Sequence, residues 1–393
     1  MILLVSLLVG ATGLILIPIT VLLFEVVLAV TLRRRAPPLP ATARPGIVIV
    51  IPAHDEDTII GDTLRAIRPQ IRSTDRLIVV ADNCRDDTAA IAAAEGAAVL
   101  RREDPVHRGK GYALDFAIRH LGCDARKTVL FIDADCRMDA RSIDSIAGLC
   151  VQTQRPVQAL YLMQAPADAG PLIRIAEFAW IVKNRVRPLG MLRLGLPCHL
   201  MGTGMAFPWA CIEAAQLATG HIAEDVKIGV ELARVGKPPL FCPEACVTSA
   251  FPKSQEGMQS QRTRWEHGQL DFALTEVPRL LVHALAERNM ALLSLVIDLC
   301  VPPLALLLLL GASLWVMSAA FYVAVHASLP LIMTTTAMSL LTLSVLLSWS
   351  RYGRGIVSLG DLLWAGRYAL AKIPLYARFL LAKQSVWVRS KRD

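Results

Sequence analysis

Two long runs almost free of charge constrain this sequence more than any other feature. Residues 1–32 contain one charged side chain, Glu25, and the run exceeds the ~20 apolar residues that a membrane-spanning helix needs. Residues 290–350 contain one acidic residue, Asp298, and no Lys or Arg. This second block is too long for one span and suits two, with a turn near residues 326–330. We therefore expect three spanning helices around a polar middle.

Basic residues beside these runs predict the orientation of the chain. Residues 33–35 are all arginine, and Arg351 and Arg354 follow the second run. Because basic flanks stay on the cytoplasmic side, we expect an outside N-terminus, a cytoplasmic middle domain and an inner-membrane location. A cleaved signal peptide is the rival interpretation, since residues 41–43 resemble a cleavage site. The chain lacks a basic start, however, and its apolar run is longer than that of a signal peptide.

The sequence divides into five segments. They are a spanning helix (1–32), a basic, proline-rich linker (33–45), a cytoplasmic domain (46–288), two spanning helices (289–350) and a basic tail (351–393). The tail mixes aromatic and basic residues, as does an amphipathic helix on a membrane surface; a solvated tail is the alternative. Much of the net charge of +8 flanks the membrane segments, so we expect lipid contact and no nucleic-acid binding.

Short apolar strands alternate with helices through the middle segment. Four strand-like runs are followed by polar residues: IVIVIPAHDED, RLIVVADNCRDDT, AAVLRRED and TVLFIDADC. This alternation predicts an α/β fold with a mostly parallel sheet. Ligands bind at the carboxyl edge of such sheets, and polar clusters at residues 54–56, 82–87 and 133–135 fall there. We therefore expect the functional site at this edge. The sequence has neither a P-loop nor a dinucleotide fingerprint.

Two carboxylates one residue apart, Asp133 and Asp135, follow the fourth strand. Like charges this close repel, so something positive should lie beside them. Alternation along an extended chain would point both side chains the same way. Two hard oxygen ligands with open positions suit Mg²⁺ or Mn²⁺ that carries substrate phosphates. The alternative is one helix cap and one solvated carboxylate, because D-x-D alone is a weak motif.

Seven short motifs occur in a fixed order: VIPAHDE, VVADNCRDDT, RGKGYAL, FIDADC, MGTGMAF, IAEDVKIG and QRTRW. Together they resemble the membrane-integrated branch of family 2 glycosyltransferases, roughly over residues 46–270. That branch includes cellulose, chitin, hyaluronan and poly-N-acetylglucosamine synthases and ceramide glucosyltransferase. The resemblance implies a GT-A fold, that of nucleotide-diphospho-sugar transferases, and a hexosyltransferase. It would use a nucleotide-sugar donor, expected to be a UDP-sugar.

The resemblance also implies roles on the donor side. Glu56 and Asp82 would hold the nucleoside, and Lys110 would approach the diphosphate. Asp135, with Asp133 assisting, would carry the metal that bridges the diphosphate and acts as a Lewis acid. Asp133 would thereby also contact the nucleotide sugar. Where the family often has two consecutive Asp residues, this chain has Ala before Asp82, which removes one acid from the nucleoside contact.

On the acceptor side, the resemblance makes Asp225 the general base for the acceptor hydroxyl. Capping of the helix that begins there is the structural alternative. In the Q-x-x-R-W motif, Gln261 is followed by Arg264, which would stabilise the leaving diphosphate, and Trp265, which would stack on the acceptor sugar. A membrane-interface anchor is the alternative role for Trp265. A flexible wall near the acceptor would come from Gly202, Thr203 and Gly204.

Several functions remain open at this stage. The acceptor could be a polysaccharide in exopolysaccharide or cell-surface glycan synthesis, with polysaccharide-export partner proteins. It could equally be a membrane lipid that receives one sugar, because three spans are few for a polymer channel. An inactive assembly subunit of a polysaccharide synthase is disfavoured by the intact Asp133, Asp225 and Arg264. A transporter is disfavoured because the spans contain few polar residues and no repeat.

A single displacement assisted by one base predicts inversion at the anomeric carbon. A donor with an α-linked sugar should give a β-glycoside, because no second carboxylate is needed as a covalent nucleophile. The anomeric proton coupling of the product, measured by NMR, checks this prediction. An α-glycoside made from an α-linked donor would contradict it.

Overall fold

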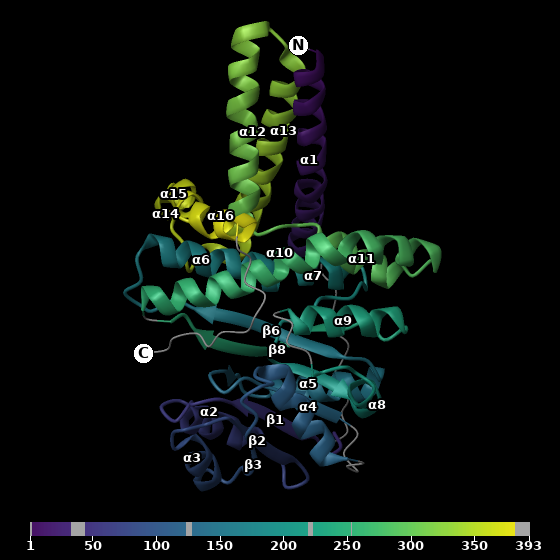
Figure 1. The fold of residues 1–393 in the computed structure, drawn as a ribbon, viewed down its shortest axis with the longest axis vertical. Coiled ribbons are helices and arrows are strands. Elements are labelled where there is room, and N and C mark those ends of the chain that lie inside the picture. The colour runs from purple at the N-terminus through teal and green to yellow at the C-terminus, as the bar shows by residue number, and fades with distance from the viewer. Residues whose placement is uncertain (1, 33–43, 123–127, 219–222, 253, 382–393) are drawn as a thin grey trace.

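Three long helices stand side by side at one end of the molecule, and the sheet lies towards the other end (Figure 1). The computed structural model describes residues 2–32, 44–122, 128–218, 223–252 and 254–381. The long helices are α1 (Ile2–Thr31), α12 (Leu304–Val325) and α13 (Ser328–Ser348). All three are long and apolar enough to cross a membrane, as the sequence predicts.

The second apolar block contains a separate helix before its two long ones. The helix α11 (Met290–Leu299) ends shortly before Pro302 and Pro303, and α12 begins at Leu304. Consecutive prolines cannot continue a helix, because each lacks a backbone N–H and restricts the residue before it. The long helices of the block therefore begin at residue 304, some distance inside the segment 289–350.

The polar domain is built on one mixed sheet of eight strands in the order β3-β2-β1-β4-β7-β6-β8-β5. The strands are β1 (Val48–Ala53), β2 (Arg76–Asp82), β3 (Ala98–Arg102), β4 (Thr128–Phe131), β5 (Arg137–Met138), β6 (Val157–Gln164), β7 (Met205–Pro208) and β8 (Leu240–Ala250). The first four strands of the predicted pattern are parallel neighbours, which confirms that expectation. The strand β7 runs antiparallel between β4 and β6.

Helices cover both faces of this sheet. Those of the sheet domain are α2 (Ile60–Ile67), α3 (Thr88–Ala94), α4 (Lys110–Leu121), α5 (Ser142–Thr153), α8 (Trp209–Glu213) and α9 (Glu224–Arg234). Neighbouring residues of one strand enter different cores: Val50 lies in one cluster and Ile51 in the other. The cluster with Ile51 continues to Leu22 of α1 and Leu307 of α12, so one apolar core joins the sheet to the long helices.

A layer of helices crosses between the sheet and the base of the long helices, and we call it the interface layer (Figure 1). It consists of α6 (Pro171–Ile181), α7 (Arg187–Arg193), α10 (Gln255–Ala286), α11, α14 (Leu359–Leu362), α15 (Ala365–Leu370) and α16 (Ile373–Leu381). A π-helical turn, η2 (Val182–Val186), joins α6 to α7. Arg174 binds Asp361 at 2.9 Å, which fixes part of the predicted tail on α6. Residues 382–393 of that tail lie outside the described residues.

Both acidic residues that interrupt the apolar runs meet one arginine. Arg187 binds Glu25 at 2.8 Å and Asp298 at 2.7 Å, and His199 lies 3.1 Å from Asp298. Burial would raise the pKa of Asp298, but the charges of Arg187 and His199 hold it well below its usual range. This cluster joins α1, α7 and α11, so Glu25 is a buried partner of Arg187 rather than a defect in a spanning helix.

A glycine allows α7 to approach α1 closely beside this cluster. A Cβ atom at Gly190 would lie 2.1 Å from the backbone oxygen of Glu25, a distance that two non-bonded atoms do not reach. Small residues at such crossings let helix backbones come together in membrane proteins. The contact therefore requires glycine at this position.

We predict that Gly190→Ala destabilises the protein by about 1–3 kcal/mol, because the added methyl group forces α7 away from α1. The midpoint of thermal unfolding in detergent should fall. Gly13→Ala is the matched control, since a Cβ atom at Gly13 in α1 would meet nothing within 4 Å. An equal midpoint for the two variants would contradict the close-approach explanation.

Candidate active site

A cavity of about 320 Å³ lies at the carboxyl edge of the parallel strands and extends to the interface layer. Its walls bring together residues that are more than two hundred positions apart in the chain. Of the site residues predicted from the sequence, it is lined by Glu56, Asp82, Lys110, Asp133, Asp135, Gly202, Asp225, Gln261, Arg264 and Trp265. One concave site of this size with converging polar groups is the usual form of a small-molecule site.

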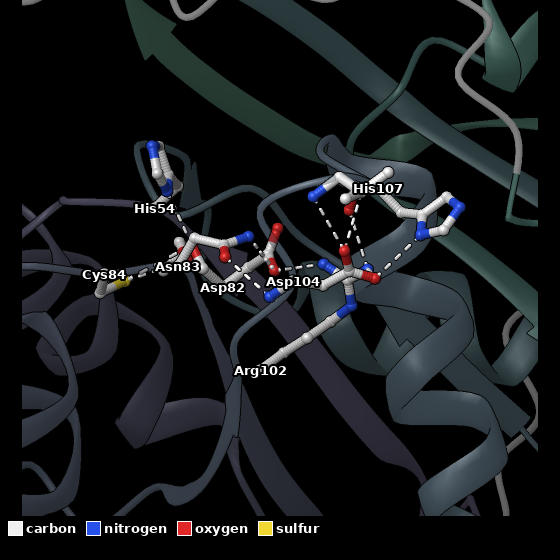
Figure 2. Close-up of polar contacts among 9 residues, drawn as sticks. His54, Asp82, Asn83, Cys84, Arg102, Asp104 and His107 are labelled. Carbon is white, nitrogen blue, oxygen red and sulfur yellow. Dashed lines mark hydrogen bonds and ion pairs between the residues drawn. The ribbon is translucent and has the colours of Figure 1, made fainter.

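Asp82 is fixed at the end of β2 by groups from two other strand ends (Figure 2). The Arg102 guanidinium lies 2.6 Å from its carboxylate, and the Asn83 side-chain amide donates to the same oxygen at 3.0 Å. His54 Nδ1 lies 2.7 Å from the Asp82 backbone oxygen, which accepts its hydrogen bond. Burial raises the pKa of Asp82, and the charge of Arg102 opposes the rise.

Arg102 extends this network beyond the residues that the motifs identified. It also binds Asp104 at 3.1 Å and donates to the backbone oxygen of His107 at 2.8 Å (Figure 2). The Asn83 side-chain oxygen accepts from the Asp104 N–H at 2.8 Å. The ends of β2 and β3 are thereby connected, so Asp82 has a fixed orientation at the cavity wall.

Asp133 and Asp135 lie in a tight turn, so the expectation of an extended chain at this point is wrong. The strand β4 ends at Phe131, and the Cys136 N–H donates to the Asp133 backbone oxygen at 3.1 Å. The turn, rather than strand alternation, brings the two carboxylates together. One ligand atom from each, together with the Cys136 sulfur, lies within 4.8 Å of the others.

Lys110 is the positive partner that these carboxylates require. Its ammonium group forms an ion pair with Asp133 and donates to the Gly202 backbone oxygen at 2.7 Å. The Asp133 N–H donates to the Thr203 hydroxyl at 3.0 Å, which fixes the turn. Lys110 begins α4, so the glycine-flanked motif delivers its charge to the carboxyl edge of β4.

The residues of this turn fit a hard divalent cation better than a soft one. Burial, aided by the charges of Asp135 and Asp133, raises the pKa of the Cys136 thiol well above its usual value. A protonated thiol is a poor metal ligand, which leaves the two carboxylates as the donor set. Two carboxylates with open positions suit Mg²⁺ or Mn²⁺ bound together with phosphate oxygens.

Glu224 and Asp225 lie in the first turn of α9, after the cap residue Ala223. The Gly111 N–H donates to the Glu224 carboxylate at 3.1 Å, and burial raises the pKa of Glu224 to about 8 although Lys110 opposes the rise. Burial also raises the pKa of Asp225, opposed by the Val226 N–H, Lys110 and Lys183. A carboxylate with a raised pKa is a stronger base than an ordinary one.

Only one of the three residues expected to form the acceptor wall lines the cavity. A Cβ atom at Gly202 would lie 3.6 Å from the Asp225 carboxylate, so glycine keeps this side open. Thr203 is fully buried behind the wall. A Cβ atom at Gly204 would lie 2.6 Å from the Val247 side chain, so this glycine serves packing against β8. The expectation for Thr203 and Gly204 is therefore corrected.

The membrane side of the cavity contains an aromatic pair. Trp265 lies beside Trp180 with ring centroids 5.0 Å apart, and the Trp180 indole donates to the Tyr161 backbone oxygen at 3.2 Å. Lys183 lies over the Trp180 ring, and its ammonium group donates to the Gln269 side chain at 2.7 Å. The two rings are tilted by 41° to each other and form an aromatic wall of the cavity, of the kind against which a sugar ring packs.

Sequence reasoning missed Trp180, Lys183 and Arg187, although a signal was present. These positions share one helical face in a mostly apolar segment, and all three line the cavity. Outside a known motif, however, such spacing does not distinguish a site from an ordinary helix surface. In the structure this helical face lies towards Asp225, and the three residues therefore belong to the site.

Residues 45–268 match the family model for glycosyltransferase-like family 2. The chain belongs to this family. An uncharacterized glycosyltransferase of Mycobacterium bovis is 34% identical over 196 residues, which cover 42% of this chain and 82% of that protein. Glucosyl-3-phosphoglycerate synthase of Mycolicibacterium paratuberculosis is 38% identical over 95 residues, and the match covers 23% of this chain and only 28% of that relative.

Among solved structures, the fold is similar to a mannosyltransferase of Pyrobaculum calidifontis in complex with GDP-mannose and Mn²⁺. The TM-score is 0.58 at 18% identity, and the match covers 96% of this chain and 99% of the other. These comparisons confirm a GT-A-like fold and a family 2 glycosyltransferase. The polysaccharide synthase branch of the family stays a prediction.

From the raised pKa of Glu224 we predict how the stability of the protein depends on pH. Its pKa of about 8 in the folded protein exceeds its ordinary value of 4.5. Between these values the folded protein retains a proton that the unfolded chain releases, so stability is lost as the pH rises from about 5 to 8. Glu224→Gln should make the thermal midpoint less dependent on pH in this range.

Glu231→Gln is the matched control, because Glu231 lies on the same helix with its side chain 39% exposed. The control should keep the pH dependence of the unmodified protein. Equal pH profiles for Glu224→Gln and the unmodified protein would contradict the raised pKa.

Proposed function

We propose that this family 2 enzyme is an inverting membrane glycosyltransferase that moves a sugar from a nucleotide-sugar donor to an acceptor at the membrane surface. The observation that carries the proposal is the cavity between the carboxyl edge of the sheet and the interface layer. Its sheet side offers carboxylates and Lys110, which suit a nucleoside diphosphate. Its membrane side offers Asp225, Arg264 and Trp265, which suit an acceptor and a leaving group.

On the donor side, Glu56 and Asp82 would accept hydrogen bonds from the base and ribose, and Lys110 would contact the diphosphate. Mg²⁺ or Mn²⁺ held by Asp133 and Asp135 would act as a Lewis acid on the leaving diphosphate. The similar mannosyltransferase, which was solved with GDP-mannose and Mn²⁺, supports this class of donor and metal. We propose a UDP-sugar as the donor, and the test below includes GDP-sugars.

On the acceptor side, Asp225 would take the proton from the acceptor hydroxyl as its oxygen attacks the anomeric carbon. The bond from that carbon to the diphosphate breaks, and the diphosphate leaves with the electron pair. Arg264 would stabilise the negative charge that develops there, with Gln261 beside it. Trp265 would hold the acceptor against its ring. The raised pKa of Asp225 supports its role as base.

We propose that α1, α12 and α13 anchor the enzyme in the inner membrane with the sheet domain in the cytoplasm. Their length and apolar composition support the anchoring. The proposed acceptor is a polysaccharide or a lipid-linked glycan in exopolysaccharide or cell-surface synthesis, with export proteins as partners of a polymerase. Transfer of one sugar to a membrane lipid is the second candidate, supported by the continuity of the cavity with the interface layer.

We predict that Asp225→Asn lowers nucleotide release from the preferred donor by about 10²–10⁴-fold, because the general base is lost. Purified protein would be assayed with Mn²⁺ or Mg²⁺ across UDP- and GDP-sugars, and EDTA should abolish the release. Asp115→Asn is the control, since Asp115 pairs with Arg119 on the outer side of α4 and does not line the cavity.

Two outcomes would count against this proposal. Nucleotide release that is unaffected by Asp225→Asn would exclude Asp225 as the base. Failure to release or bind any nucleotide sugar, with folded protein, would instead favour an inactive assembly subunit.

A further inference from the structure

A second cavity of about 90 Å³ adjoins the main one on its membrane side. The two cavities share the side chains of Trp180, Lys183 and Trp265. The second is also lined by Arg262, by Leu22 of α1 and by Leu304 at the start of α12. We call it the interface cavity. Residues of the interface layer and of the long helices α1 and α12 line it, and it adjoins the candidate active site.

Four basic side chains line the interface cavity, and two of them are neutralised by carboxylates. Arg187 is paired with Glu25 and Asp298, and Lys372 forms an ion pair with Glu266. The other two, Lys183 and Arg262, differ from these. Neither forms an ion pair with a carboxylate among the residues that the structure describes.

Lys183 has a neutral partner, the Gln269 side chain, at 2.7 Å. Burial lowers the pKa of Lys183, and the negative charge of Asp225 opposes that effect only in part. Arg262 lies against the rings of Phe251 and Tyr368, with its guanidinium carbon 5.8 and 6.0 Å from their centroids. Its Nη2 nitrogen is buried and has no hydrogen-bond partner within the described part of the chain.

Two cations without carboxylate partners favour an anion in this cavity, because the one carboxylate in its lining, Glu266, is already paired with Lys372. Removing charges from water costs several kcal/mol per ion unless opposite charge and hydrogen bonds replace the water. A guanidinium and an ammonium group are the side chains that bind phosphate best. The cavity has room for roughly three water molecules, which is the scale of a phosphate group.

We propose that the interface cavity binds the phosphate of a membrane phospholipid that also bears a free hydroxyl, and that this lipid is the acceptor. The proposal rests on the proposed function. The apolar chain of the lipid would lie along the residues near Leu22 and Leu304. The hydroxyl of the lipid would reach Asp225 where the two cavities adjoin. A neutral polysaccharide would add no counter-charge beside Lys183 and Arg262, so the cavity favours the lipid.

The test is direct binding of three probes to the purified full-length protein, measured by tryptophan fluorescence. Short-chain phosphatidylglycerol has a chain, a phosphate and free hydroxyls. Diacylglycerol of the same chain length lacks the phosphate, and glycerol 3-phosphate lacks the chain. Phosphatidylglycerol should bind at least about tenfold more tightly than either of the other probes, because only it engages both the cations and the apolar walls.

Arg262→Gln should weaken phosphatidylglycerol binding by about tenfold or more, because a charge-assisted contact is lost. Arg262 occupies a position that the Q-x-x-R-W pattern leaves open. Lys183→Gln should weaken binding to a similar extent, which keeps the test decisive if one variant does not fold. The matched control is Arg367→Gln, since Arg367 in α15 stacks on Trp364 at 5.1 Å and lines neither cavity.

Unchanged phosphatidylglycerol binding by folded Arg262→Gln and Lys183→Gln would overturn the proposal. Equal binding of diacylglycerol would overturn the phosphate site, and equal binding of glycerol 3-phosphate would replace the lipid with a soluble acceptor. Nucleotide-sugar turnover is measured on the same preparations. If the enzyme turns over the nucleotide sugar but both variants bind the lipid as tightly as the unmodified protein does, the lipid site in the interface cavity is refuted and the proposed function is not. Charge-dependent lipid binding without any turnover refutes the proposed function instead.

Discussion

The contact of Arg187 with Glu25 and Asp298 joins the first long helix to the interface layer beside the cavity. It places one cation between a long apolar helix, the interface layer and the wall of the cavity. Burying ionisable groups is costly, and the cost is offset only when their geometry is well matched. Glycine at position 190 lets the backbones approach at the same crossing. The cavity therefore has a fixed relation to the long helices, on which the proposed acceptor site depends.

A similar principle organises the donor side. Carboxylates gather where parallel strands end, and each of two is neutralised by a cation from another element: Asp82 by Arg102, and Asp133 by Lys110. These pairs fix the side chains before any substrate is present. Preorganisation of this kind reduces the cost of binding a diphosphate and its metal. Lys110 would then move its contact from a carboxylate to the incoming phosphate, a small change within hydrogen-bonding reach.

Local patterns predicted the parts of the fold that depend on neighbouring residues. The short apolar runs at residues 48–53 and 76–82, with helices between them, predicted parallel strands, and the long apolar runs predicted helices. Predictions failed where the chain leaves regular structure. The pair Asp133 and Asp135 lies in a turn, and Thr203 faces away from the cavity because its hydroxyl serves the backbone of that turn. A motif specifies which residues occur together in a sequence, but it does not specify which of their side chains line the cavity.

The sequence by itself determined three apolar helices, a parallel α/β core and the family motifs, because helix and strand periods and short motifs are written in adjacent residues. Only the tertiary structure decided that Arg187 neutralises Glu25, that Trp180 pairs with Trp265, and that Lys183 and Arg262 share a cavity without carboxylate partners. Charge pairing and cavity shape depend on which distant segments meet in space. Neighbouring residues do not determine these contacts between distant segments, because the contacts follow from the packing of the whole chain.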